Sequence, residues 1–458
     1  MSGRARVIVP ALLAIVVIVA GVLLGGGLTF DGLPSATQAA AGGSVTEPFG
    51  TAQPPTPAPT PTERPALGAT ELYGYLPYWQ MTDSMASYLD DSPVSTLLLF
   101  SVTARRSGAL NDTATGYRRI TGPIGRRLID DAHRRDARVE LVFSSFGADR
   151  NGRLFGRLVG PPSPTPGPSV PLGGASSVPA SPAPASPAPA SPTPASPAPT
   201  ATPGPPPWHR AVDELVALAV DLGVDGINVD VETLDVLDRP AYGEFLGELR
   251  HALQAVRPHA RVTVATEAGP RGVGNASTAA AAGVDRVFLM GYDYHWSGSQ
   301  PGASAPIDRL DGVYSLRWSI DAYVDAGVPR DRIVLGLPLY GMQWRTDGID
   351  RTSAVIGAGV TWIPGKHPDV LLVPHFAPFR DAIEQAEYIV EPTIDGFLLT
   401  YYDSPATLRS KLALALDNGL AGAGFWALGY ERGLPGYQEL MRDFRNGRIG
   451  REEAPTRP

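Results

Sequence analysis

The sequence of 458 residues contains no cysteine and only 7 histidines. Without cysteine the chain has no disulfide bond, no thiolate metal ligand and no cysteine nucleophile. The histidines are not paired at the spacing of metal ligands, so we expect no zinc site. The sequence therefore predicts a protein that works with neither a metal nor an organic cofactor.

Positive charge is also in short supply, because 38 Lys and Arg residues stand against 46 Asp and Glu residues, a formal net charge of −8. Binding to nucleic-acid phosphates requires clustered Lys and Arg, so we expect no nucleic-acid partner. No feature indicates an obligate protein partner either. Hydrophobic residues make up 43% of the chain, which is enough for a sizeable core.

One long apolar run lies near the N-terminus, where Arg4 and Arg6 precede the uncharged segment from Val7 to Leu28. At about 1.5 Å per residue this segment reaches about 33 Å, enough to cross a hydrocarbon core ~30 Å thick. Arginines on its N-terminal side favour a cytoplasmic N-terminus. We expect residues 1–30 to anchor the protein in the cell membrane with its folded part outside the cytoplasm. The alternative is a signal peptide cleaved near Ala39–Ala41, which would give a secreted protein.

Proline is concentrated in two stretches. Residues 31–69 include a Pro/Thr-rich run and are expected to form a disordered linker. Residues 161–207 hold 19 prolines among 47 residues and no charge. Because proline fixes φ and has no N–H to donate, we expect this second stretch to be an extended, structureless insertion within a domain.

Around these stretches, apolar strand-like runs alternate with helical patterns such as Ala211–Leu222, Tyr242–Val256 and Pro405–Asn418. The alternation predicts a (β/α)8 TIM barrel over residues 70–445 rather than an open doubly wound sheet. The barrel is longer than the ~250 residues typical of this fold, which predicts a small inserted subdomain at 342–404, after strand seven. The Pro-rich insertion follows strand three, and residues 446–458 form a polar tail. The predicted strands are Leu72–Trp79, Thr96–Thr103, Val139–Phe146, Gly226–Glu232, Val262–Glu267, Val287–Asp293, Ile333–Tyr340 and Gly424–Leu428.

The fourth predicted strand carries an unusual set of polar residues. Alternate residues of a strand share a face, so Asn228, Asp230 and Glu232 point one way, into the barrel. Two carboxylates and an amide inside a barrel cost several kcal/mol of desolvation unless they are partnered. Two such carboxylates also repel each other, which raises one pKa and suits a general acid. The stack therefore indicates a catalytic site rather than a structural polar cluster.

This strand, Asp225 to Glu232, resembles the Asp-Gly-x-Asp-x-Asp-x-Glu signature of glycoside hydrolase family 18, which includes chitinases and cell-wall glucosaminidases. Four further segments resemble other strands of the family, and the first of them is similar to its spore-cortex and wall-lytic branch. These segments are Tyr73–Trp79, Met290–Asp293, Leu335–Gly341 and Gly424–Leu428.

The resemblance implies a retaining glycosidase in which the substrate's own 2-acetamido oxygen attacks the anomeric carbon and forms an oxazolinium intermediate. By position, Glu232 would be the general acid and base, and Asp230 would orient the acetamido group. Tyr292 would bind its carbonyl, with Asp293 nearby in the same subsite, and Trp426 would form the floor under the sugar. Further aromatic side chains are candidates for additional sugar subsites, namely Tyr75, Trp79, Tyr294, Trp296 and Trp344.

One residue departs from the family signature, because Asn228 stands at its second Asp, which is the first Asp of the Asp-x-Asp-x-Glu triad. An amide cannot share a proton with Asp230, so we expect the pKa of Asp230 to be less raised than it would be beside a carboxyl group. The wall-lytic branch commonly shows this Asn. The resemblance implies an exported hydrolase that cuts β-1,4 bonds beside N-acetylglucosamine in a polysaccharide or oligosaccharide, either peptidoglycan or chitin. A non-catalytic chitinase-like barrel that binds carbohydrate is the alternative.

Overall fold

The computed structural model describes residues 70–145, 205–309, 312, 314–373 and 376–449. Four predicted segments therefore lie wholly or mostly outside the described residues: the anchor at 1–30, the linker at 31–69, the Pro-rich insertion at 161–207 and the polar tail at 446–458. Within the described part of the chain, no helix combines the length and apolar composition needed to cross a membrane.

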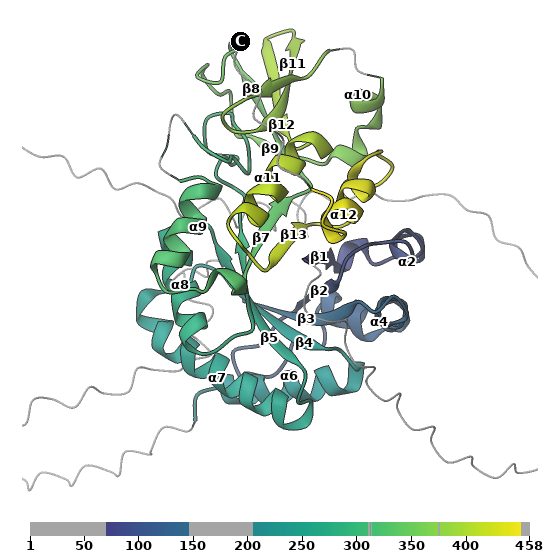
Figure 1. Ribbon diagram of the computed structural model, residues 1–458, viewed down its shortest axis with the longest axis vertical. Helices are drawn as coiled ribbons and strands as arrows, with labels where there is room; N and C mark the ends of the chain where they lie inside the picture. The colour runs from purple at the N-terminus through teal and green to yellow at the C-terminus, as the bar shows by residue number, and fades with distance from the viewer. Residues whose placement is uncertain (1–69, 146–204, 310–311, 313, 374–375, 450–458) are drawn as a thin grey trace, which may run out of the picture.

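Eight parallel strands close into a barrel, which confirms the predicted fold (Figure 1). Each predicted strand is present, although β6 ends three residues before Asp293 and the last strand begins two residues before Gly424. The strands in chain order are β1 (Glu71–Pro77), β2 (Thr96–Val102), β3 (Arg138–Ser145), β4 (Gly226–Val231), β5 (Arg261–Glu267), β6 (Arg286–Met290), β7 (Ile333–Pro338) and β13 (Gly422–Trp426).

Helices surround the barrel and follow the predicted apolar periodicity. In α6 the buried residues recur at helical spacing, and the helix ends at Gly223, whose φ of 72° is readily adopted only without a side chain. The helices around the barrel are α2 (Asp83–Leu89), α3 (Thr115–Thr121), α4 (Pro123–Arg134), α6 (Trp208–Leu222), α7 (Arg239–Val256), α8 (Pro270–Ala281), α9 (Leu316–Asp325), α11 (Pro405–Asp417) and α12 (Tyr437–Arg445).

The predicted inserted subdomain lies between β7 and α11 and contains a second, antiparallel sheet with strand order β10-β11-β12-β8-β9. In Figure 1 this sheet stands at the top of the molecule, beyond one end of the barrel. Its elements are β8 (Gly341–Thr346), β9 (Val360–Trp362), α10 (Pro368–Leu372), β10 (Phe379–Asp381), β11 (Ala386–Thr393) and β12 (Gly396–Tyr402).

The alternation of residues along each barrel strand creates two separate cores. On β4, Ile227, Val229 and Val231 are buried in the larger core, which the helices share. The smaller core fills the barrel interior and includes Phe288 of β6. A Cβ at Gly336 of the neighbouring β7 would lie 2.3 Å from the Phe288 ring, so glycine there makes room for this ring inside the barrel.

A buried ion pair joins the inserted subdomain to the barrel. Lys411 of α11 donates to Asp403, which follows β12, and both side chains are almost fully buried. The Thr407 hydroxyl also donates to Asp403 (2.8 Å), and the Tyr437 hydroxyl donates to its backbone carbonyl (2.8 Å). Removing one partner of such a pair leaves an uncompensated charge in the interior.

We expect Lys411→Met to destabilise the protein by about 3–5 kcal/mol, because it leaves the Asp403 carboxylate buried without its cation. The double variant Lys411→Met/Asp403→Asn should recover a large part of this loss. Chemical denaturation followed by fluorescence measures both effects. As a control, Arg345→Met breaks the exposed pair with Asp395 and should cost less than about 1 kcal/mol. Equal losses in Lys411→Met and Arg345→Met would contradict this expectation.

Candidate functional site

The predicted polar stack on β4 faces the barrel interior, as the alternation of the strand requires. Asn228 is fully buried and is fixed from both sides. Its Oδ1 accepts from the Tyr75 hydroxyl of β1 (3.0 Å), and its Nδ2 donates to Thr263 Oγ1 of β5 (2.8 Å). The Thr263 hydroxyl in turn donates to Glu140 Oε2 of β3 (2.5 Å). Four strands thus hold the layer below Asp230 by hydrogen bonds that cross the barrel.

Above this layer, the carboxyl groups of Asp230 and Glu232 are not fully hydrogen-bonded by the described residues. Asp230 is 4% exposed, and Glu232 directly follows β4, where its N–H donates to Ser145 O of β3 (3.2 Å). Asp230 Oδ1 and Glu232 Oε2 are both buried, and neither has a hydrogen-bond partner among the described residues. A buried carboxyl oxygen without a partner costs stability, so these two atoms can accept or donate a hydrogen bond that the described residues do not supply.

The electrostatics of the two carboxyl groups favour their protonated forms. Burial raises the pKa of Glu232 well above its usual range, and the negative charge of Asp230 adds to the shift. Burial also raises the pKa of Asp230, with a further contribution from Glu267. The amide of Asn228 adds no charge, yet burial and Glu267 still raise the pKa of Asp230. Glu232 can therefore hold a proton near neutral pH, as a general acid must.

Glu267 at the end of β5 is part of this site, although sequence analysis did not single it out. Its Oε1 accepts from the backbone N–H of Thr233 (2.8 Å), the residue after Glu232. Thr233 has a φ of 56°, a conformation that β-branched residues rarely adopt, so this hydrogen bond holds a strained residue beside the acid. The available signal was the place of Glu267 as the last residue of a predicted strand next to β4.

Aromatic rings line the interior beside the carboxyl groups. The Trp426 ring at the end of β13 lies 5.6 Å from Tyr75 and 6.4 Å from Trp79, measured between ring centroids. Phe100 of β2, which sequence analysis missed, lies 4.7 Å from Trp426 in an edge-to-face contact. Trp79 and Trp426 are only partly buried against this interior cluster. The structure thus brings three predicted aromatic residues together, with two indole rings at the border of the barrel interior.

The segment after β6 adds two more predicted residues. Tyr292 is partly buried against the same interior cluster, and Asp293 adopts a φ of 62°. The Tyr340 hydroxyl donates to Asp293 Oδ1 (2.5 Å), and the Asp293 N–H donates to Ser304 Oγ (3.0 Å). Burial raises the pKa of Asp293 to about 6, although the hydrogen bonds from Tyr340 and Ser304 oppose this shift. Neither Tyr340 nor Ser304 was identified from the sequence as a site residue.

Two residues predicted to contact sugar, Trp344 and Tyr294, lie in the protein core in this structure. Trp344 of β8 is fully buried and packs against Tyr401 inside the inserted sheet, where no polysaccharide can reach its ring. Tyr294 is 9% exposed, and its hydroxyl is hydrogen-bonded to Ser319 of α9 (2.6 Å). Both rings serve as core residues, which is the commonest role of a buried aromatic side chain. Trp296 is partly exposed and remains a prediction.

Within the described residues, no group of three or more His, Asp or Glu side chains is arranged to hold a metal ion. The two carboxyl groups can supply acid–base and electrostatic chemistry. A partly exposed aromatic surface lies beside two buried carboxyl groups, and this combination suits a ligand with apolar ring faces and polar edges.

Comparison with known proteins agrees with this site. Residues 209–431, which include β4, β6, β7 and β13, match the sequence profile of Glycosyl hydrolases family 18. Over these matched residues the barrel belongs to glycoside hydrolase family 18. One protein similar in sequence to this chain is Chitinase 1 of Aphanocladium album, which is 29% identical over 233 residues, or 46% of this chain and 53% of that protein. The Cortical fragment-lytic enzyme of Bacillus anthracis is 23% identical over 239 residues, or 48% of this chain and 50% of that protein.

A solved chitinase structure has a similar fold. A mutant of class V chitinase from Nicotiana tobaccum, solved in complex with NAG4, superposes with a TM-score of 0.61 at 19% identity over 83% of this chain and 99% of that one. At this identity the likeness concerns the fold. The chain spans about half the length of the curated relatives described above. The chain is therefore similar in sequence to proteins whose names refer to chitin and to cortical fragments, and similar in fold to a class V chitinase.

We expect Glu232→Gln to stabilise the protein increasingly as pH rises. The folded-state pKa of Glu232 is raised, so its contribution to stability is complete below the unfolded value and is lost as pH rises toward the folded value. The amide carries no such penalty. The melting temperature of Glu232→Gln minus that of the wild type should be near zero at pH 4 and positive by several degrees at pH 8.

The upper bound on this effect is about 1.4 kcal/mol per pH unit above about pH 4.5. Scanning calorimetry at five pH values measures it. The matched control is Glu244→Gln on the exposed side of α7, whose melting-temperature difference should not change with pH. A pH-independent difference for Glu232→Gln would show that Glu232 ionises as freely in the folded protein as in the unfolded chain.

Proposed function

We propose that this family 18 hydrolase is an exported, retaining glycosidase that cuts β-1,4 bonds next to N-acetylglucosamine. The observation that carries the proposal is the pair of buried carboxyl oxygens on Asp230 and Glu232, which have no partner among the described residues, in a barrel whose interior cluster is bordered by the Trp426 ring. Such a pair is costly for stability, and a bound sugar that approaches a proton donor and an ionisable acceptor would use both oxygens.

In the first step, Glu232 donates its proton to the glycosidic oxygen while the acetamido carbonyl oxygen of the same sugar attacks C1. The bond between C1 and the glycosidic oxygen breaks, the leaving sugar departs with the proton, and an oxazolinium ion remains. Asp230 would act as a carboxylate: the positive charge that develops on the acetamido nitrogen favours its ionised form over the protonated form that burial favours, and the carboxylate stabilises that charge in turn. The raised pKa of Glu232 supports this step, because the acid must be protonated when the substrate binds.

In the second step, the Glu232 carboxylate takes a proton from water, and the water oxygen attacks C1. The bond from C1 to the acetamido oxygen breaks, and the product has the β configuration of the substrate. Two inversions at C1 give overall retention without a nucleophile from the protein. Glu232 is protonated again at the end, and atoms and charge balance over the cycle.

The other side chains would bind and orient the sugar. Tyr292 would donate to the acetamido carbonyl, and Asp293 would bind in the same subsite. The Trp426 ring would lie under the apolar face of the distorted sugar with Trp79 beside it, while Tyr75, which is buried and hydrogen-bonded to Asn228, would support the Trp426 ring from inside the barrel. Trp296, which follows on the same segment as Tyr292, is proposed to contact a neighbouring sugar.

The proposed substrate is a glycan that contains N-acetylglucosamine, either peptidoglycan or chitin. Two of the similar proteins are named a chitinase and a cortical fragment-lytic enzyme, so both glycans are represented among them. Export is proposed from the apolar segment Val7–Leu28, which would retain the enzyme at the cell membrane on the outer side, unless the segment is cleaved and the protein secreted. Both glycans lie outside the cytoplasm.

The test is to incubate the purified full-length protein with N-acetylglucosamine oligosaccharides and, separately, with peptidoglycan glycan strands, and to identify the new ends by mass spectrometry. We expect cleavage of one of the two, with N-acetylglucosamine at the new reducing end. Glu232→Gln should lower kcat by at least about 10³-fold and leave the Kd for the glycan within about threefold, because the amide has the shape of the acid but no proton to give.

The control is Glu244→Gln, which should keep the wild-type rate. If Glu232→Gln kept that rate, Glu232 would not be the acid. If the wild type bound a glycan but cleaved neither substrate, the protein would instead be a carbohydrate-binding barrel without activity.

A further inference from the structure

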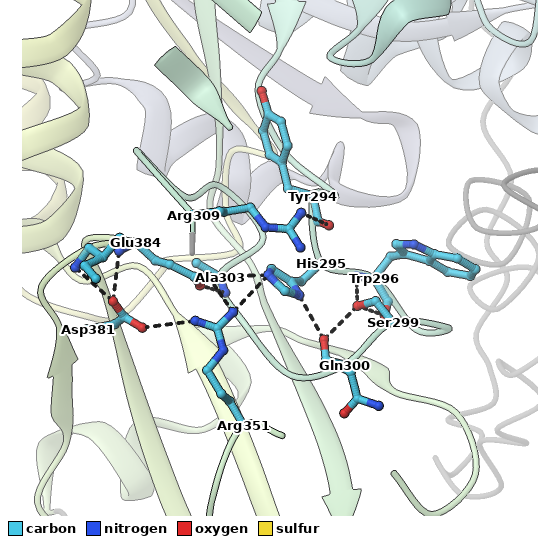
Figure 2. A network of polar contacts seen from close by, with 11 residues as sticks. Tyr294, His295, Trp296, Ser299, Gln300, Ala303, Arg309, Arg351, Asp381 and Glu384 are labelled. Carbon is cyan, nitrogen blue, oxygen red and sulfur yellow. Dashed lines mark hydrogen bonds and ion pairs between the residues drawn. The ribbon is translucent and has the colours of Figure 1, made fainter. Parts of the chain in front are cut away.

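A buried carboxylate of the inserted subdomain contacts the segment that carries Tyr292 and Asp293. Glu384 lies between β10 and β11 and is fully buried. Its Oε2 accepts from the backbone N–H of Ala303 (2.7 Å), and its backbone carbonyl accepts from the N–H of Ile307 (3.1 Å). Figure 2 shows Glu384 and Ala303 facing each other across the boundary between the two segments.

Three side chains also hold Glu384 in place, two from the inserted subdomain and one, His295, from the segment that carries Asp293. Arg351 Nη2 donates to Glu384 Oε1 (2.6 Å), and His295 Nε2 lies 3.4 Å from the same oxygen. Asp381 Oδ1 accepts from the backbone N–H of Glu384 (2.9 Å), and its other oxygen lies 3.6 Å from Arg351 Nη1. Both the charge and the backbone of Glu384 are therefore fixed (Figure 2).

Ala303 is followed directly by Ser304, which is hydrogen-bonded to Asp293 of the site. The neighbouring Ser304 accepts from the Asp293 N–H through its Oγ (3.0 Å) and from the Tyr294 N–H through its carbonyl oxygen (3.0 Å). Asp293 has a left-handed backbone conformation, which is uncommon for a residue with a side chain and persists only where its surroundings hold it. The hydrogen bonds to Ser304 help to hold Asp293 in this conformation, and Glu384 fixes the neighbouring Ala303.

We propose that Glu384 is a positioning residue for Asp293 and Tyr292, acting through the Ala303 N–H and the Ser304 hydroxyl. In this role the inserted subdomain orients the segment that is proposed to bind the acetamido group, although Glu384 lies about 90 residues from Asp293 along the chain. The functional part of this inference rests on the proposed glycosidase activity. The structural part, that Glu384 orders Asp293, does not.

The first experiment measures hydrogen exchange in peptides that cover residues 291–305 of the full-length protein. In Glu384→Ala we expect the amides of Ala303 and Asp293 to exchange at least about tenfold faster, because each loses its acceptor or the support of that acceptor. Glu384→Gln keeps an oxygen for the Ala303 N–H and should retain most of the protection. The control Asp395→Asn, on the exposed side of the same sheet, should change neither amide.

The second experiment is a double-mutant cycle on glycan hydrolysis. Glu384→Ala should lower kcat/KM by at least about tenfold in the wild type but by less than about twofold in a protein that already carries Asp293→Asn. A fraction of misfolded enzyme would lower the apparent kcat and leave KM unchanged. We therefore also expect KM to rise, and Glu384→Gln to restore it.

The two experiments separate the two ideas. If Asp293 exchanges at the wild-type rate in Glu384→Ala, or if the two substitutions have fully additive effects on kcat/KM, the positioning role is overturned. If the wild type cleaves no glycan, the proposed activity fails, and hydrogen exchange alone decides whether Glu384 orders Asp293.

Discussion

The site depends on two buried carboxyl oxygens, Asp230 Oδ1 and Glu232 Oε2, which have no hydrogen-bond partner among the described residues. Folding normally avoids such an arrangement, because each unpartnered oxygen lowers stability. Here the cost is offset by the layer below, where Asn228 is hydrogen-bonded to Tyr75 and Thr263 and the strands are locked in register. Hydrogen bonds thus hold the layer around Asn228, whereas the next layer contains the carboxyl oxygens of Asp230 and Glu232 that lack a partner among the described residues. A ligand would bind at this second layer.

Much of the fold could be predicted from the sequence because it follows from the spacing of apolar residues along the chain. All eight barrel strands are apolar runs of about the right length, and the helices between them repeat apolar residues at 3.6 spacing. The face of β4 that points inward was predictable for the same reason, since alternation leaves no choice once Ile227 and Val229 pack outward. Strand ends were less certain. Asp293 was expected inside a strand, whereas β6 ends at Met290 and the next residues turn back toward Ser304.

Residue type predicted the site less well than position did. Trp344 and Tyr294 were expected to contact sugar because they are aromatic, but nothing in a single sequence distinguishes a buried ring from an exposed one. Phe100, Glu267 and Tyr340 were missed for the opposite reason, because each belongs to the site through a neighbour that lies far away in the sequence. Pairings such as Tyr340 with Asp293 arise from closure of the barrel, and no local pattern reports them. The strand-end carboxylate Glu267 is the one that a more systematic reading of β5 could have found.

The inserted subdomain changes how the site is held together. In a bare barrel, the segment after β6 would be fixed only by its own hydrogen bonds and by the strands beside it. Here it is also bonded to Glu384, which Arg351 and Asp381 secure within the insertion, and the buried pair of Lys411 and Asp403 ties the insertion to α11. A sequence of fixed contacts therefore runs from a barrel helix, through the second sheet, to the backbone beside Asp293. Because Glu384, Asp403 and Lys411 are fully or almost fully buried, solvent cannot replace a contact that one of them loses, and the geometry around Asp293 depends on residues that no glycan would touch.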